Sequence, residues 1–193
     1  MSAIELLAFA GSTRTDSFNK KLVRLAADYA REAGAEVTLV DLRDFPMPFY
    51  DGDLEATQGL PENARALKAL MIAHDGFLLS CPEYNSSISA VLKNTLDWIS
   101  RAQPDEPPMP AFRGKVAGLL AASPGNLGGV RGLFAVRQIL TVLGTIVLPT
   151  QFALARVREA FDERGALKDA AQRKSVAAVA AELVALAVKL RRD

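Results

Sequence analysis

The stretch IELLAFAGSTRTDSFNKKLVRLAADYAREAG, residues 4–34, decides the fold of this chain. It opens with an apolar run, residues 4–10, that predicts a buried strand, and a turn-rich segment, residues 11–17, follows. Apolar residues then recur at helical spacing from Leu22 until Gly34, where the helix is expected to stop. The pattern predicts a strand, a loop and a helix, which is the first half of a β-α-β unit.

The same alternation of strand and helix continues along the chain. Further strands are predicted at residues 36–42, 77–80, 115–122 and 145–148, and further helices at residues 61–73, 88–100, 133–143 and 168–190. Such alternation favours parallel pairing through right-handed crossovers. We therefore expect an α/β three-layer sandwich, with a five-stranded parallel sheet and helices on both faces. No linker or repeat interrupts the pattern, so one domain is expected over residues 1–193.

Three loops leave the carboxyl ends of predicted strands and have unusual compositions. They are the first loop (residues 11–19), the second loop (residues 81–87) and the third loop (residues 123–132). In parallel α/β sheets, ligands bind beyond the carboxyl ends of the strands, near the point where the winding direction switches. We therefore expect the three loops to converge on one ligand.

The first loop has the chemistry of an anion site. Gly11 permits a tight exit from the strand, and the helix that follows supplies free N–H groups and partial positive charge. Ser12, Ser17 and Asn19 would add neutral donors, and Arg14 a formal charge. This set suits a terminal phosphate monoester, because the glycines of a dinucleotide fingerprint and the Gly-Lys-Ser/Thr of a P-loop are absent. The alternative is an ordinary capped helix start.

The second and third loops have the properties of a slot for a planar heterocycle. Pro82 stiffens the exit from its strand, Tyr84 offers a flat amphipathic surface and Asn85 offers paired donor and acceptor groups. The third loop contains glycines, which let the backbone approach a ligand closely. A plain strand-to-helix turn is the alternative for the second loop, and a merely flexible loop for the third.

The composition excludes several classes of function. The chain has 23 Lys and Arg against 22 Asp and Glu, so its net charge of +1 argues against a nucleic-acid binder. One Cys and one His exclude an internal disulfide and a Cys/His zinc site. No apolar run approaches the ~20 residues of a membrane helix. We expect a soluble, cytoplasmic protein without a metal site, a membrane or a nucleic acid as partner, whose chemistry comes from a cofactor. We assign no catalytic side chain.

Three motifs resemble those of the NAD(P)H-dependent FMN reductase family, a flavodoxin-like branch that includes chromate and quinone reductases. They are GSTRTDSFN at residues 11–19, PEYNSSISAVLKNTLDW at residues 82–98 and SPGNLGGVRG at residues 123–132. The resemblance implies a flavodoxin-like sheet of order 2-1-3-4-5 and a single FMN-binding domain over the whole chain. The family usually has Pro and Gly where Ser89 and Ala90 stand, a departure that bears on the local helix start more than on the cofactor.

The resemblance also implies which residues hold a non-covalently bound FMN. The phosphate would lie in the first loop, against Gly11, Ser12, Arg14, Ser17 and Asn19. The isoalloxazine ring would lie along Pro82, Glu83, Tyr84, Asn85 and Ser86, with Ser123 and Gly125 closing the other side. The family forms homodimers or homotetramers, which makes Glu83, Lys93, Asp97 and Arg101 candidate interface residues.

The activity implied is that of an FMN-dependent oxidoreductase. NADPH or NADH would pass a hydride to the bound FMN, and a small-molecule acceptor would then take the electrons. Quinone, chromate, azo compound, ferric complex and flavin are all compatible with an open flavin face. The alternative is an FMN-binding, flavodoxin-like electron carrier or redox sensor without nicotinamide turnover.

Overall fold

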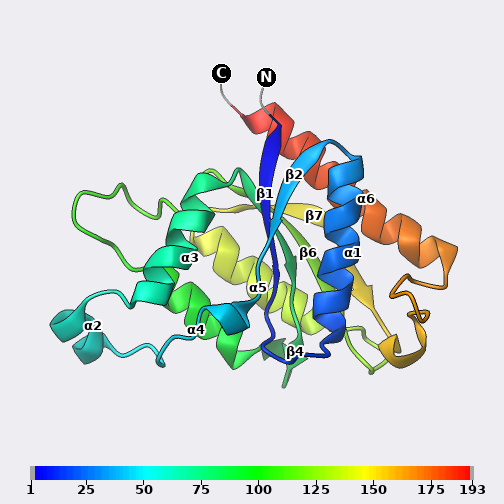
Figure 1. Cartoon of the computed structure of the whole chain (residues 1–193), viewed down its shortest axis with the longest axis horizontal. Coiled ribbons are helices and arrows are strands. Elements are labelled where there is room, and N and C mark those ends of the chain that lie inside the picture. Colours follow the sequence, from blue (N-terminus) through cyan, green and yellow to red (C-terminus); the bar gives the residue numbers. More distant parts are fainter. Residues whose placement is uncertain (1–2, 192–193) are drawn as a thin grey trace.

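A computed structural model describes residues 3–191, and a five-stranded parallel sheet forms its centre (Figure 1). The strands are β1 (Ile4–Ala10), β2 (Ala35–Leu39), β3 (Gly76–Ser80), β6 (Val116–Ala122) and β7 (Ile146–Leu154). They lie in the order β2-β1-β3-β6-β7. Counting only the strands of this sheet, the order is the predicted 2-1-3-4-5. Two short strands, β4 (Glu83–Tyr84) and β5 (Ser87–Ile88), form a separate antiparallel hairpin.

Helices cover both faces of the sheet, as predicted. On one side lie α1 (Phe18–Glu32) and α6 (Ala170–Leu190), and on the other α3 (Glu62–Ala73), α4 (Ala90–Ile99) and α5 (Val130–Val142) (Figure 1). Strand β1 shows why both layers form, because Leu6 and Ala8 enter one core cluster while Leu7 and Phe9 enter the other. A strand buried on both faces is the rule in parallel sheets.

The three loops leave the sheet at the same level. The backbone ladder continues past the strand ends, since the N–H of Gly11 donates to the carbonyl of Ser80 at 2.9 Å. In the same way, the N–H of Cys81 donates to the carbonyl of Leu120 at 2.7 Å. These bonds fix the exits of the first and second loops beside each other at the switch point between β1 and β3.

Two predicted strand boundaries are wrong. Strand β2 ends at Leu39 instead of residue 42, because the Asp41 carboxylate accepts the N–H of Arg43 and starts the 3-10 turn η1 (Leu42–Asp44). The last strand does not stop at residue 148 but runs on to Leu154, past an irregularity in its register with β6. A proline is tolerated inside this strand because it lies at a bulge on the sheet edge.

Arg137 covers the exposed edge at this bulge. Its guanidinium donates to the carbonyls of Val147 and Leu148, at 3.3 and 2.7 Å, and to Oε1 of Gln151 at 2.8 Å. These bonds satisfy edge carbonyls that would otherwise be free to pair with another strand.

Three further elements differ from the prediction. Helix α5 begins at Val130, three residues before the predicted start, and α4 begins at Ala90 instead of residue 88. A short helix, α2 (Gly52–Gln58), lies in a segment for which no helix was expected, and Asp51 caps it by accepting two backbone N–H groups. The segment after β7 forms a second 3-10 turn, η2 (Val157–Glu159).

Candidate functional site

A cavity of about 250 Å³ lies at the carboxyl end of the sheet, and residues of all three loops line it. Its lining consists of Ser12, Arg14, Ser17, Phe18, Asn19, Pro82, Glu83, Tyr84, Ala122, Ser123, Pro124 and Arg158. Eight of these residues belong to the set expected from the sequence. Gly11, Asn85, Ser86 and Gly125 of that set do not line the cavity. Phe18, Ala122, Pro124 and Arg158 line it without having been expected.

Ser17 has the geometry of an anion ligand at the start of α1. It occupies the N-cap position and is almost completely buried, yet its side chain makes no capping hydrogen bond to the helix. The first turn of α1 carries no acidic residue, and its first N–H groups have no partner within the helix. A buried hydroxyl beside free N–H groups and a partial positive charge fits a phosphate group.

Ser12 and Arg14 complete this end of the cavity. The Ser12 hydroxyl accepts the N–H of Arg14 at 3.3 Å, which folds the first loop back on itself. The Arg14 guanidinium donates to the carbonyl of Asp16 at 3.2 Å and forms no ion pair within residues 3–191. The Asp16 carboxylate is paired with Lys21, which together with the Arg14 charge lowers the Asp16 pKa. Its charge is therefore available to an anion in the cavity.

Asn19 lines the cavity, but its side chain binds the sheet. Its amide donates to the carbonyl of Ala122 at 2.9 Å, while its Oδ1 accepts the N–H of Ala122 at 3.0 Å and the hydroxyl of Ser80 at 2.8 Å. These bonds join the start of α1 to the carboxyl ends of β3 and β6. One amide hydrogen and the backbone N–H are left for a ligand.

Glu83 ties the second loop to the start of α5. Its Oε2 accepts the backbone N–H groups of Arg131 and Gly132, at 3.0 and 3.3 Å. Its Oε1 accepts Nε of Arg131 at 2.7 Å, and the two side chains form an ion pair. Burial opposes ionisation of Glu83, but these hydrogen bonds and the Arg131 charge outweigh it and hold the Glu83 pKa below its usual value. The carboxylate is thus committed within the chain.

Gly132 favours this contact, because any larger residue would crowd it. A Cβ at Gly132 would lie 3.2 Å from Cβ of Glu83 and 3.3 Å from the carbonyl oxygen of Ser87. The absent side chain lets the β4–β5 hairpin pack directly on α5. The distance between the second and third loops is therefore fixed by the Glu83–Arg131 ion pair and by the close contact of Gly132 with the hairpin.

The second loop forms a tight hairpin, β4–β5, and not the plain strand-to-helix turn considered as the alternative. Asn85 and Ser86, at its tip, both have positive φ, 51° and 65°, which is the backbone of a two-residue type I′ turn. Ile88, predicted as helical, belongs to β5. Tyr84 lies at the mouth of the cavity with 55% of its surface exposed, so its ring is accessible from outside.

Ser89 explains how the chain departs from the usual family sequence. It is the N-cap of α4, where its hydroxyl accepts the N–H of Leu92 at 3.3 Å and donates to the carbonyl of Gly11 at 2.6 Å. A Cβ at Gly11 would lie 2.9 Å from Cδ2 of Leu92, so the first loop and α4 are in direct contact. Ser89 therefore gives α4 a regular start and anchors the first loop.

Two of the four glycines in the third loop, Gly125 and Gly128, differ in what their lack of a side chain achieves. A Cβ at Gly128 would lie 2.7 Å from the backbone of Ala153, so packing against β7 requires the glycine. A Cβ at Gly125 would meet only Oγ of Ser123, at 3.6 Å. Packing within the chain therefore does not account for Gly125. The loop is also held from behind, since the N–H of Val157 donates to the carbonyl of Ser123 at 3.2 Å.

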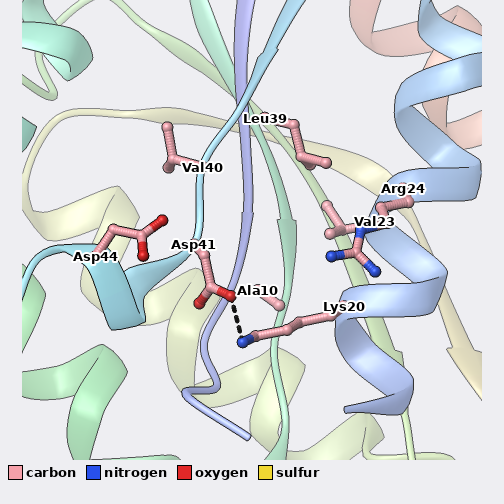
Figure 2. Close-up of a pocket in the computed structure, with 8 residues that line it drawn as sticks. All are labelled: Ala10, Lys20, Val23, Arg24, Leu39, Val40, Asp41 and Asp44. Carbon is pink, nitrogen blue, oxygen red and sulfur yellow. Dashed lines mark hydrogen bonds and ion pairs between the residues drawn. The ribbon is translucent and has the colours of Figure 1, made fainter. Parts of the chain in front are cut away.

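A second, smaller cavity of about 160 Å³ lies beside the carboxyl end of β2 (Figure 2). The buried ammonium of Lys20 crosses it to the Asp41 carboxylate at 2.5 Å. Partial burial opposes ionisation of Asp41, but the hydrogen bonds from Lys20 and from the N–H of Arg43 lower its pKa. The pair holds the start of α1 against the end of β2, and its charges satisfy each other.

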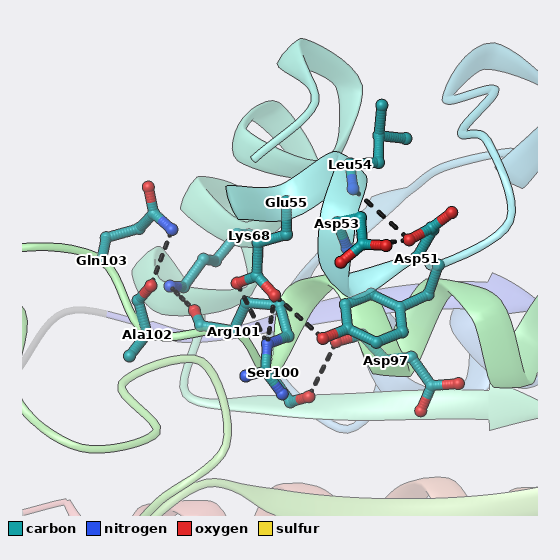
Figure 3. A network of polar contacts seen from close by, with 11 residues as sticks. Asp51, Asp53, Leu54, Glu55, Lys68, Asp97, Ser100, Arg101, Ala102 and Gln103 are labelled. Atoms are coloured by element: carbon teal, nitrogen blue, oxygen red, sulfur yellow. Dashed lines mark hydrogen bonds and ion pairs between the residues drawn. The ribbon is translucent and has the colours of Figure 1, made fainter. Parts of the chain in front are cut away.

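The residues considered for an interface have partners within the chain. Lys93 bonds both carboxylate oxygens of Asp97, at 2.7 and 2.8 Å, one turn along α4. Arg101 pairs with Glu55 at 3.1 Å and lies over the ring of Tyr50, in a network that joins α2 to the end of α4 (Figure 3). These pairs are partly exposed, so a subunit contact over them would have to cover formed ion pairs.

The LKNTLDW part of the second motif has a structural role. Nδ2 of Asn94 and Nε1 of Trp98 both donate to the carbonyl of Pro48, at 2.9 and 2.8 Å. The rings of Trp98 and Tyr50 make an edge contact with centroids 5.0 Å apart. The motif therefore fastens the loop after β2 to α4, and Trp98 is a packing residue.

The two side chains best suited to nucleophilic or acid-base catalysis, Cys81 and His74, do not line the cavity. Cys81 is fully buried, and burial raises the pKa of its thiol to about 12. Nδ1 of His74 lies 2.7 Å from the carbonyl of Leu70, at the end of α3. Within residues 3–191, no group of three His, Cys, Asp or Glu could hold a metal ion, and no helix is long and apolar enough to cross a membrane.

Known proteins resemble this chain over most of its length. A profile of the family described as NADPH-dependent FMN reductase matches residues 4–159. An NAD(P)H:quinone oxidoreductase of Solanum tuberosum is 33% identical over 193 residues, 97% of this chain and 95% of the relative. An NAD(P)H-dependent FMN reductase of Pseudomonas aeruginosa is 34% identical over 167 residues, which are 86% of this chain and 85% of the relative. The solved flavoenzyme NAD(P)H:(acceptor) oxidoreductase FerB of Paracoccus denitrificans has a TM-score of 0.80 at 26% identity, covering 97% of this chain and 98% of its own.

The sheet order and the cavity at its switch point are those of a flavodoxin-like protein. The matches above narrow this class further. The chain belongs to the NADPH-dependent FMN reductase family. This membership confirms the expected type of enzyme, an NAD(P)H-dependent FMN or quinone reductase, with FMN as cofactor and a reduced nicotinamide as co-substrate.

Proposed function

We propose that the chain, as one domain over residues 1–193, holds FMN in the 250 Å³ cavity with the phosphate at the start of α1. The observation that carries this placement is Ser17, a buried N-cap residue whose hydroxyl does not cap its own helix. Ser12 and Arg14 lie on the same wall. Gly11 lets the first loop pack on α4, and Asn19 orients the start of α1 toward the ligand.

The ring of the cofactor is assigned to the slot between the second and third loops. Pro82 and Tyr84 line this slot, and Glu83 sets its width through Arg131. Asn85 and Ser86, at the hairpin tip, would contribute backbone groups to the ring edge, because their side chains are exposed. On the third loop, Ser123 and Gly125 complete the assignment. Gly125 supports it because packing within the chain does not require glycine there.

When bound, FMN would supply the hydride and electron transfer, and the protein supplies binding, orientation and electrostatics. In this placement the outer side of the ring would stay open beside Tyr84, which is exposed at the cavity mouth. We assign no catalytic side chain, since Cys81 is fully buried and the His74 ring contacts the Leu70 carbonyl at the end of α3.

The proposed acceptor is a small oxidised molecule that can take the place of the nicotinamide over the ring. A quinone is the acceptor we favour, because the Solanum tuberosum relative is named an NAD(P)H:quinone oxidoreductase. Chromate, azo compounds, ferric complexes and free flavin fit the same open face. We also propose a cytoplasmic homodimer or homotetramer, with Glu83, Lys93, Asp97 and Arg101 near the subunit contact.

The test of the phosphate site is the double variant Arg14→Ala with Ser17→Ala. FMN retention should weaken at least about tenfold, since charge-assisted hydrogen bonds contribute ~1.5–3 kcal/mol each. Arg113→Ala, an exposed arginine beside the amino end of β6, is the matched control. Unchanged affinity in the double variant would refute the placement.

The test of the activity is a visible spectrum followed by mixing with NADPH or NADH and a quinone. A yellow protein whose flavin is bleached by a nicotinamide and restored by quinone supports the enzyme. A yellow protein that neither nicotinamide reduces would instead be an electron carrier or redox sensor. A protein that cannot be reconstituted with FMN would refute both.

A further inference from the structure

Arg158 is a cation of the cavity that no motif pointed to. It lies on η2, after β7, in a segment that the sequence patterns did not resolve. Its neighbour Val157 is fully buried and donates its N–H to the carbonyl of Ser123, which brings η2 against the third loop. The side chain of Arg158 lines the same cavity as Ser12 and Ser17.

The Arg158 guanidinium has no partner within the part of the chain that the structure describes. It makes no hydrogen bond or ion pair with another residue there, and the residue is exposed at the cavity wall. Arginines on a protein surface near carboxylates usually pair with them, as Arg101 and Arg131 do here. Arg158 instead faces a cavity whose acid, Glu83, is already engaged.

The charges around the cavity leave a surplus of two cations. Its ionisable lining residues are Arg14, Arg158 and Glu83. Arg131 neutralises Glu83, so two guanidinium groups, those of Arg14 and Arg158, remain in the lining without a carboxylate in the lining to balance them. Asp16, outside the lining, is paired with Lys21 and also feels the Arg14 charge. A phosphate monoester carries about −1.5 to −2 at neutral pH, which matches two guanidinium groups.

The bonds of Asn19 are a second reason to expect another hydrogen-bond donor at the phosphate end of the cavity. Three of its hydrogen-bonding positions are taken by Ala122 and Ser80, so its side chain offers a ligand a single amide hydrogen. Arginine presents a planar fork that binds phosphate through two parallel hydrogen bonds. A long side chain from η2 can provide this contact from the β7 side of the cavity.

We propose that Arg158 is a second cationic ligand of the FMN phosphate, acting together with Arg14. This inference rests on the proposed function, because it places the flavin phosphate in the cavity. It assigns a binding role to a residue outside the three loops, and it makes the segment after β7 part of the cofactor site.

The test uses Arg158→Gln, which keeps a polar but shorter side chain and removes the charge. Apoprotein is titrated with FMN and, in parallel, with riboflavin, which has the same ring without the phosphate. We expect the dissociation constant for FMN to rise at least about tenfold, as for one charge-assisted bond, and that for riboflavin to change less than about twofold. Arg158→Lys should recover part of the loss, and Arg113→Gln, which removes the same charge elsewhere, should bind FMN like the wild type.

The alternative outcomes separate failure of this inference from failure of the proposed function. If the wild-type apoprotein binds no FMN, the proposed function fails. If it binds FMN and Arg158→Gln binds equally well, the inference is overturned. Equal weakening of FMN and riboflavin would also overturn it, since it would indicate a contact with the ring or a loss of structure. A raised KM for NADPH with unchanged FMN affinity would overturn it in favour of a role in binding the co-substrate.

Discussion

Replacing Glu83 by Gln tests whether one carboxylate holds the second and third loops together. The amide keeps the size of the side chain and one accepting oxygen. It loses the charge, and with it the ion pair to Arg131 and the charge assistance of the bonds from the N–H groups of Arg131 and Gly132. The Glu83 side chain is 8% exposed, so its bonds are little weakened by water.

The expected loss in the free energy of unfolding follows from the bonds that Glu83 makes. Hydrogen bonds to a charged group contribute ~1.5–3 kcal/mol each. The Arg131 side chain is 52% exposed, so its ion pair adds less than ~1 kcal/mol. Because the amide still accepts one bond, we expect a net loss of ~2–3 kcal/mol at pH 7. For a domain of this size, that lowers Tm by roughly 5–10 °C.

The loss should also depend on pH with a definite sign. The Glu83 pKa is lowered on folding from its usual 4.5, so the folded state favours the ionised form. The stabilisation is therefore complete above pH 4.5 and is lost as the pH falls through the folded-state pKa. The difference between wild type and Glu83→Gln should be constant near neutrality and shrink in acid.

Urea unfolding followed by circular dichroism, at pH values from about 3 to 8, measures this difference. Glu182→Gln, which alters an exposed acid on α6, is the matched control and should unfold like the wild type. A difference below about 0.5 kcal/mol at pH 7, or one that stays constant into acid, would contradict the role given to this carboxylate.

Three further predictions concern other contacts around the cavity. Ser89→Ala should lower the free energy of unfolding by ~1–2 kcal/mol in urea, because it removes the cap of α4 and the donor to Gly11. Asn19→Asp should cost ~2–4 kcal/mol in the same assay, since it leaves the Ala122 carbonyl without its donor and buries a charge. Cys81 should resist iodoacetamide at pH 8 in the folded protein and react in urea, as its raised pKa and full burial require; rapid alkylation without denaturant would contradict the packing.

Local patterns were enough to predict the layers and the convergence of the loops. Hydrophobic periodicity identifies strands and helices, and parallel pairing then places the loops after β1, β3 and β6 at one end. The same patterns do not reveal partners that are distant in sequence. The sequence indicated only a role for Asn19 at the phosphate. Its bonds to Ser80 and Ala122 could not be predicted from local patterns, because they join residues 61 and 103 positions apart. The partner of Glu83 is likewise 48 positions away.

Arg158 and the hairpin show two other limits of sequence patterns. The position of Arg158 depends on how far β7 extends, and a strand that passes a bulge at a proline has no regular alternation to detect. The hairpin tip lacks glycine, since Asn85 and Ser86 both adopt positive φ. A type I′ turn is usually recognised by Asn-Gly. In both cases the surrounding structure overrides the local signal.

The amide of Asn19 also imposes an order on assembly. The start of α1 reaches its final position only when β3 and β6 have joined the sheet, because its anchors lie on those strands. Contacts between residues so distant along the chain require a long loop to close, so we expect them to form late. The proposed phosphate site is thus expected to be completed near the end of folding, and FMN is expected to enter an already folded apoprotein instead of guiding a nascent chain. A fragment that ends before β6 should consequently have no affinity for the cofactor.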